Sequence, residues 1–128
     1  MNILLDTHLL IWTATRPERL TPAARAHLGD PDNVLFFSAV SVWEIGIKRE
    51  LQRLDFQIDS QKLRDLLLAN DYQEVDLTSR HGLAVQDLPL LHRDPFDRAL
   101  IAQAVCEGLT LITADADIAR YQGPILKV

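Results

Sequence analysis

The sequence contains a single cysteine, Cys106, among its 128 residues. No intramolecular disulfide can form, so the fold does not depend on an oxidising compartment. The apolar stretch at the N-terminus ends at Asp6. It is too short for the apolar region of a signal peptide or for a membrane span. We therefore expect a cytoplasmic protein that does not associate with membranes.

Basic and aromatic residues are also few. The chain has 13 Lys and Arg against 18 Asp and Glu, which gives a formal net charge of −5. This balance argues against nucleic-acid binding, which uses Lys and Arg for phosphate contacts. However, acids gathered around bound cations would not repel phosphate as the net charge suggests. With only two Trp and two Tyr, we interpret Trp12 and Trp43 as core or dimer-contact residues rather than platforms for RNA bases.

What the sequence does have is an alternation of strand-like and helix-like segments. This order is typical of an α/β domain with a mostly parallel sheet, and we expect one domain over residues 1–128. Strands are predicted at 2–5, 34–37, 74–77, 109–113 and 124–128, the last as an edge strand. Helices are predicted at 7–14, 22–29, 38–51, 61–70, 79–87 and 95–107, with a short helix after Asp115.

Four acids stand near strand ends or helix starts: Asp6, Glu44, Asp97 and Asp115. Each has an explanation that involves no chemistry. Asp6 and Asp115 are suited to cap helices. Glu44 has the last position of a possible capping box that begins at Ser41, and Asp97 lies where a carboxylate favours the helix dipole.

Considered together, these acids predict a metal site. Ligands of open parallel sheets bind at the carboxyl ends of the strands, so neighbouring strands would bring the four carboxylates to one crevice. Four anions repel unless they are neutralised. An all-oxygen set without thiolates or paired histidines suits Mg²⁺ or Mn²⁺. The chemistry this favours is metal-assisted attack of water on a phosphodiester.

Several neighbouring residues are candidates for supporting roles. Thr7 and Thr113 are placed to bond a carboxylate, a metal-bound water or a phosphate, or else to bond the local backbone. Arg98 is a candidate to orient Asp97 or to contact phosphate, with a solvated surface position as the alternative.

Other polar residues have a weaker relation to the acids. Lys48, Arg49 and Arg53 form a basic patch at the end of a predicted helix, where they either contact RNA or offset the helix dipole. His8 and His92 lie near the acids along the chain. No two histidines have the spacing of zinc ligands on a helix.

With these residues in view, the sequence resembles the PIN-domain ribonucleases, and specifically the VapC-type toxins of toxin–antitoxin pairs. The resemblance spans essentially the whole chain and rests on LLDTH at 4–8, SAVSVWEI at 38–45, HRDPFDRALIAQA at 92–104 and LITAD at 111–115. It implies a three-layer α/β/α sandwich and Mg²⁺- or Mn²⁺-dependent cleavage of RNA. It also implies a homodimer, and inhibition by a cognate antitoxin whose C-terminal segment enters the acidic groove.

The resemblance also assigns roles to the acids. Asp6, Glu44 and Asp97 match the metal-holding acids of the family, and Asp115 matches a fourth that sometimes acts through water. Asp94 competes with Asp97, and we choose Asp97 because its position matches the family's acid. Asp117 competes with Asp115, and we choose Asp115 because it is nearer the strand end.

Three other readings remain open. A phosphatase with an aspartate nucleophile would require a second Asp at position 8, which is His8 in this sequence. A receiver domain would want adjacent paired acids and a Lys at a late strand end, and Lys127 is too close to the terminus. A non-catalytic PIN-like module that binds RNA or protein is disfavoured because all four acids are present.

Overall fold

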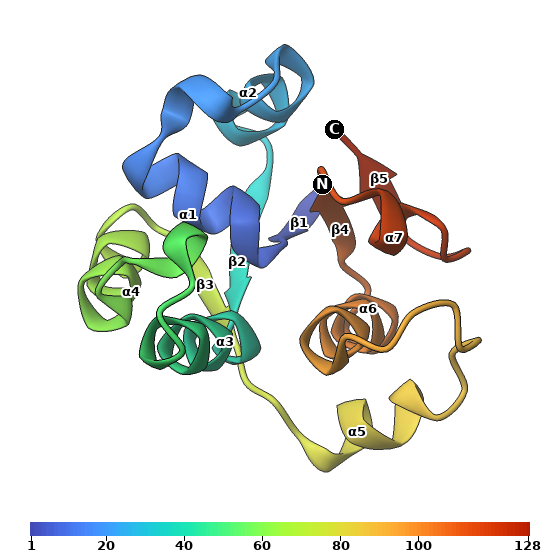
Figure 1. Cartoon of the computed structure of the whole chain (residues 1–128). Helices are drawn as coiled ribbons and strands as arrows, with labels where there is room; N and C mark the ends of the chain where they lie inside the picture. The colour runs from blue at the N-terminus through green and yellow to red at the C-terminus, as the bar shows by residue number, and fades with distance from the viewer.

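The computed structural model, which describes residues 1–128, has a five-stranded sheet between helices (Figure 1). The strands are β1 (Asn2–Leu5), β2 (Val34–Ser38), β3 (Gln73–Val75), β4 (Thr110–Thr113) and β5 (Ile125–Lys127). Their order is β3-β2-β1-β4-β5, and every neighbouring pair is parallel. The predicted α/β class and parallel sheet are confirmed, with β5 as an edge strand.

The helices also follow the prediction, with small shifts at their ends. They are α1 (Thr7–Thr15), α2 (Pro22–Gly29), α3 (Ala39–Glu50), α4 (Ser60–Ala69), α5 (Ser79–Val85), α6 (Pro95–Glu107) and α7 (Ala116–Ala119), with 3-10 turns η1 (Pro17–Arg19) and η2 (Leu54–Phe56). Gly108 ends α6 with a φ of 67°, a left-handed conformation that favours glycine. None of these helices has the length and apolar character needed to cross a membrane.

The start of α3 corrects one local interpretation. Ser41 does not begin a capping box. Instead Ser38, the last residue of β2, caps α3 by accepting a hydrogen bond from the Val40 amide at 3.0 Å. The helix begins at Ala39, close to the predicted start at 38, and Glu44 lies beyond its first turn.

Both faces of the sheet are covered by helices, which makes the three layers. Ile3 and Leu5 of β1 pack in one apolar cluster with residues of α1, α2 and α4. Leu4 points to the opposite face and packs with residues of α6 and α7, as the two-residue period of a strand requires. In Figure 1, α1, α2 and α4 lie on one side of the sheet and α5 and α6 on the other.

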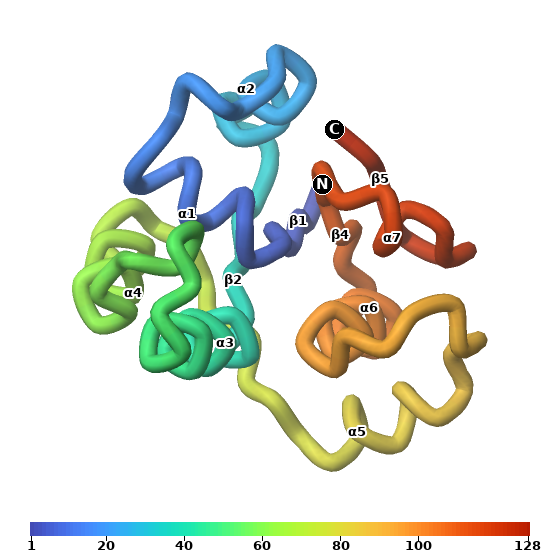
Figure 2. Tube along the Cα trace, in the orientation of Figure 1, coloured from blue at the N-terminus to red at the C-terminus, as the bar shows by residue number.

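The connection after β3 sets the location of the site. The chain crosses to the other face there and passes through α5 and α6 before it enters β4 (Figure 2). Because β4 pairs with β1, the strand order reverses between these two strands. β1 leads into α1 on one face, and β4 leads into α7 on the other. Such a switch point opens a crevice at the carboxyl ends of the strands.

Candidate metal centre and active site

Asp6 lies at the end of β1, and its carboxylate is held from two directions. One oxygen caps α1 by accepting a hydrogen bond from the Leu9 amide at 2.9 Å. The other accepts a hydrogen bond from the hydroxyl of Thr113, at the end of β4. The side chain is buried, and burial raises the pKa of Asp6 above its usual value, although the hydrogen bonds from Thr113 and Leu9 oppose this.

Asp115 lies beside Asp6 at the same switch point. Its Oδ1 caps α7 by accepting hydrogen bonds from the amides of Asp117 and Ile118, at 2.7 and 3.3 Å. The negative charge of Asp115 also contributes to the raised pKa of Asp6. The two acids line one cavity of about 230 Å³. The competing Asp117 is exposed and pairs with Arg120 at 3.7 Å.

Glu44 is buried on the inner side of α3. Its Oε1 accepts a hydrogen bond from Thr7 Oγ1 at 2.6 Å, and Thr7 also shares a hydrogen bond with Ser41 Oγ at 2.9 Å. Its Oε2 accepts a hydrogen bond from Lys48 Nζ at 2.5 Å. Thr7 follows Asp6 in sequence, so the start of α1 links Glu44 to the end of β1.

Lys48 is the main cation of the site rather than part of a surface basic patch. It is half-buried, and its Nζ lies 4.8 Å from the centre of the Phe56 ring and 5.6 Å from that of Phe96. It is also 3.9 Å from Asp94 Oδ2. The sequence carries a signal for this pair, because residues four apart on a helix face each other.

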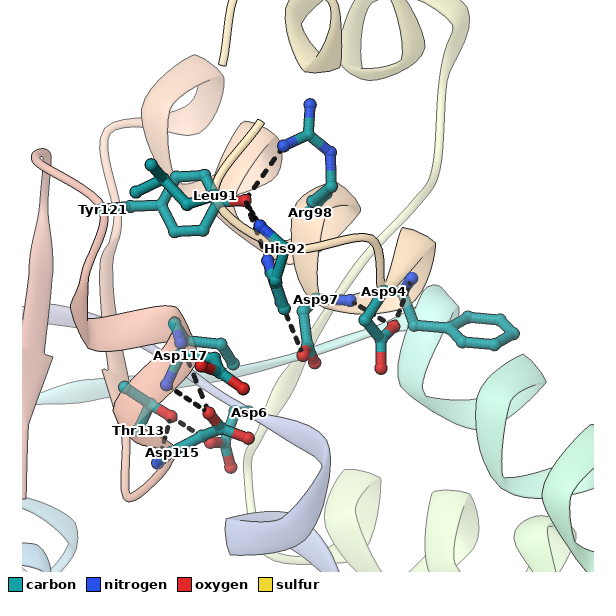
Figure 3. Close-up of polar contacts among 12 residues, drawn as sticks. Asp6, Leu91, His92, Asp94, Asp97, Arg98, Thr113, Asp115, Asp117 and Tyr121 are labelled. Atoms are coloured by element: carbon teal, nitrogen blue, oxygen red, sulfur yellow. Dashed lines mark hydrogen bonds and ion pairs between the residues drawn. The ribbon is translucent and has the colours of Figure 1, made fainter. Parts of the chain in front are cut away.

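Asp97 approaches the same crevice from the first turn of α6. Asp94 caps this helix by accepting hydrogen bonds from the amides of Phe96 and Asp97. Burial, followed by the nearby charge of Asp94, raises the pKa of Asp97 to about 7. A hydrogen bond with His92 opposes the shift, while the charges of Glu44 and Asp115 add to it. Figure 3 shows Asp97 pointing toward the side of the site where Asp6, Thr113 and Asp115 lie.

A chain of hydrogen bonds connects Arg98, Tyr121 and His92 to Asp97 (Figure 3). Tyr121 Oη accepts hydrogen bonds from Arg98 at 2.9 Å and from the His92 amide at 3.3 Å, and it lies 2.8 Å from His92 Nδ1. The tyrosine proton is therefore free to be donated to Nδ1. That arrangement places the ring proton on Nε2, which is 3.1 Å from Asp97 Oδ2.

The location of Arg98 corrects an expectation. Arg98 neither contacts Asp97 nor lies in solvent. Its guanidinium is buried and donates hydrogen bonds to Tyr121 Oη and to the carbonyls of Pro89 and Val85. Arg98 thus acts on Asp97 only through Tyr121 and His92. Sequence reasoning missed this link, because Tyr121 is 29 residues from His92.

Of the two roles predicted for Trp43, core residue or dimer contact, the structure excludes the first. Trp43 is 57% exposed, and its ring meets the edge of Phe96 with 5.0 Å between centroids. The inner face of α3 is instead occupied by Val40, Ser41, Glu44 and Ile45. Two polar residues of the site, Ser41 and Glu44, therefore lie on the buried side of α3, where apolar residues are usual.

The structure thus brings the four predicted acids, Asp6, Glu44, Asp97 and Asp115, to the carboxyl side of the sheet. Their charges act on one another, and all their donor atoms are oxygen, as a hard divalent cation prefers. As placed, however, no group of three Asp, Glu, His or Cys side chains is close enough to hold a metal ion. Thr113, Lys48 and His92 already bond Asp6, Glu44 and Asp97 respectively.

Comparison with known proteins tests the family resemblance. The model of the PIN domain matches residues 3–124. The chain belongs to the PIN-domain family. Ribonuclease VapC22 of Mycobacterium tuberculosis (strain ATCC 25618 / H37Rv) is 28% identical to this PIN domain over 124 residues, which cover 96% of this chain and 94% of that protein.

Two solved structures resemble this PIN domain over nearly its whole length. VapBC2 from Rickettsia felis, bound to a DNA fragment from its promoter, has a TM-score of 0.71 at 16% identity and covers 100% of this chain and 98% of its own. A toxin–antitoxin complex from Klebsiella pneumoniae has a TM-score of 0.60 at 21% identity, with coverage of 97% and 95%. The PIN-like fold and the homology to VapC ribonuclease toxins are thereby confirmed. PIN nucleases are generally metal-dependent.

Proposed function

We propose that this PIN domain is a metal-dependent endoribonuclease toxin that hydrolyses RNA phosphodiester bonds and is held inactive by a cognate antitoxin. The observation that carries the proposal is the convergence of acids from four separate segments at the β1–β4 switch point. Burial and mutual repulsion raise the pKa values of Asp6 and Asp97. Perturbed acids in a crevice are typical of catalytic sites.

The residues present suit Mg²⁺ or Mn²⁺. We propose that Asp6, Glu44 and Asp97 hold the ion and that Asp115 engages it more loosely. A cation among them would relieve the repulsion that raises the pKa of Asp97. When bound, such an ion lowers the pKa of a water molecule and offsets negative charge on phosphate.

The residues around the acids then have distinct tasks. Thr113 and Thr7 fix Asp6 and Glu44 through their hydroxyls. His92 fixes Asp97. The Lys48 ammonium lies next to Glu44 and near Asp94, so it lowers the negative charge that an approaching phosphate meets.

Names of the relatives support the proposed partners. The relative from Mycobacterium tuberculosis is a ribonuclease, and that from Klebsiella pneumoniae is a toxin–antitoxin complex. We propose by homology that this chain acts on RNA and binds an antitoxin protein. We also propose a homodimer, because Trp43 and Leu83 expose apolar surface on α3 and α5.

The deciding experiment measures RNA cleavage with and without the metal. Purified protein is incubated with structured and single-stranded RNA in Mn²⁺ or in EDTA, alongside Asp6→Asn. The matched control is Asp32→Asn, which makes the same change at an exposed turn. We expect cleavage by the parent and by Asp32→Asn in Mn²⁺ only.

Two results would overturn the proposal. Cleavage that persists both in EDTA and in Asp6→Asn would show that it depends on neither the metal nor the Asp6 carboxylate. Binding of RNA without cleavage in Mn²⁺ or Mg²⁺ would favour the non-catalytic module instead.

A further inference from the structure

A second cavity adjoins the one that contains Asp6 and Asp115. It has a volume of about 370 Å³ and is lined by Trp12 of α1, by Arg16 and Arg19 after that helix, and by the segment around η2. This volume lies within the range of about 300 to 1,000 Å³ usual for ligand sites. We call this second cavity the arginine cavity.

The arginine cavity and the acidic cavity share a boundary. Trp12 lines both of them. His8 lines the acidic cavity and Asp55 lines the arginine cavity, and His8 Nε2 lies 3.1 Å from Asp55 Oδ2. Trp12 and the His8–Asp55 pair therefore form the boundary between two neighbouring cavities, and an extended ligand that occupied both would pass over this boundary.

The two arginines of this cavity are not neutralised by the protein. Neither Arg16 nor Arg19 forms a salt bridge, and neither side chain donates a hydrogen bond to the protein. The one carboxylate that lines the cavity, Asp55, already faces His8 and, at 3.9 Å, Arg53. In a chain with a net charge of −5, two free guanidinium groups in one cavity mark it for an anion.

Arg19 is also positioned in advance. Its guanidinium carbon lies 4.9 Å from the centre of the Trp12 ring, close enough for a cation–π contact. This contact orders the side chain without using its N–H groups, which remain available. Guanidinium groups bind phosphate through two parallel hydrogen bonds. Because the Trp12 contact already orders the Arg19 side chain, less side-chain freedom is lost when phosphate binds.

We propose that the arginine cavity binds a backbone phosphate of the RNA strand whose neighbouring phosphodiester lies at the acids. This inference rests on the proposed function, because it assigns the strand a path from the acidic cavity past Trp12 to Arg16 and Arg19. RNA suits both spaces because its charges repeat along one chain. An acidic segment of a partner protein would suit the arginine cavity alone.

The test measures RNA binding rather than cleavage. A 5′-fluorescein-labelled single-stranded RNA of mixed sequence is titrated with the full chain in EDTA, at several salt concentrations, and followed by fluorescence anisotropy. The test variant is Arg16→Gln/Arg19→Gln. The control, Lys62→Gln/Lys127→Gln, removes the same charge from exposed residues that line neither cavity. A hexaglutamate peptide is titrated in parallel.

We expect the arginine variant to bind RNA about tenfold more weakly or worse. The slope of log K against log salt should fall by about 0.7, since one phosphate contact on a single strand contributes about that much and the cavity holds one phosphate. The control should stay within about twofold of the parent. Arginine and control variants that bind alike would overturn the proposal. So would loss of hexaglutamate binding in the arginine variant with RNA binding unchanged, which would indicate a protein partner.

The same titration separates this proposal from the proposed function. Arginine-dependent RNA binding without cleavage in Mn²⁺ would leave the phosphate site in place and remove the nuclease. Cleavage in Mn²⁺ together with RNA binding that is unchanged in the arginine variant would support the nuclease and remove the phosphate site. Failure of the parent to bind the RNA at all would overturn the arginine cavity as an RNA site.

Discussion

The two sides of the candidate site hold their acids by different means. On the strand side, Asp6 and Asp115 each cap a helix, so backbone amides fix their carboxylates. On the helix side, Glu44 and Asp97 accept no hydrogen bond from a backbone amide. Glu44 depends on Thr7 and Lys48, and Asp97 depends on His92.

This difference separates what the fold fixes from what single side chains fix. A cap remains in place as long as its helix starts there, because the donors are main-chain atoms. A carboxylate held by Lys48 or His92 loses its position when that one partner is removed. The helix side is therefore where substitutions outside the four acids should change the site most.

The largest expected effect comes from the acids of the helix side. Asp97→Asn should lower RNA cleavage about a thousandfold, because losing several kcal/mol of stabilisation of the reacting phosphate costs roughly a factor of ten per 1.4 kcal/mol. Asp94→Asn should stay within about tenfold, since Asn caps α6 as well as Asp does. Single-turnover cleavage in Mn²⁺ measures both. Equal losses of cleavage in the two variants would show that cleavage depends on the negative charge at the start of α6 and not on the Asp97 carboxylate in particular.

The pKa of Asp97 predicts a pH dependence of metal affinity. Its value of about 7 means that a metal must displace a proton below pH 7. Calorimetric affinity for Mn²⁺ should therefore fall about tenfold per pH unit from pH 7 to pH 5, and change little above pH 8. A flat profile over this range would contradict the assignment of Asp97 as a ligand.

Without metal, the raised pKa of Asp97 makes folding stability depend on pH. This stability falls as pH rises, whereas metal affinity increases. The folded-state pKa of Asp97 exceeds the value of 3.8 for the free side chain. The native state therefore binds more protons between these values, and stability falls as pH rises through that window. Unfolding in EDTA should show Asp97→Asn losing part of this dependence.

Removal of Lys48 should destabilise the fold by about 3 kcal/mol, because it leaves the buried carboxylate of Glu44 without its cation. Lys48→Met retains the apolar stem that packs near Phe56 and Phe96. Adding Glu44→Gln to Lys48→Met should restore most of the loss, since no unpaired charge remains. Urea unfolding of the four members of this double-mutant cycle measures the coupling. Additive effects would show that the two side chains do not stabilise each other.

Much of the strand side follows from local rules. Asp6 and Asp115 stand where a strand ends and a helix begins, and Asp94-Pro95 marks the start of α6. Such signals need only a few neighbouring residues. They place three of the four acids at helix starts, and the alternation of strands and helices predicts a sheet that brings them near each other.

The helix side needed tertiary information. α3 turns Ser41 and Glu44 inward and leaves Trp43 exposed, the reverse of what hydrophobicity predicts for a buried face. Local rules fail most often at functional sites, where chemistry outweighs packing. The link from Tyr121 to His92 joins the segment before α6 to the segment after α7, and no local spacing predicts it.

The smallest expected effect tests this distant link. Tyr121→Phe removes the hydroxyl between Arg98 and His92 and leaves the aromatic ring. His92 then loses the partner that fixes its orientation toward Asp97. Loss of such an outer partner costs about ten- to a hundredfold in metal affinity, and we expect the lower end because His92 itself remains.

The matched control for this change is Tyr72→Phe, which alters a buried tyrosine whose hydroxyl makes no hydrogen bond and which lies in the opposite apolar cluster. Both variants should retain the fold by circular dichroism, and only Tyr121→Phe should weaken Mn²⁺ binding. A specific loss there would show that the helix side of the site is held from the far end of the chain. Equal Mn²⁺ affinities in the two variants would mean that His92 keeps its orientation without Tyr121, and the contrast between the two sides of the site would then rest on Lys48 and His92 alone.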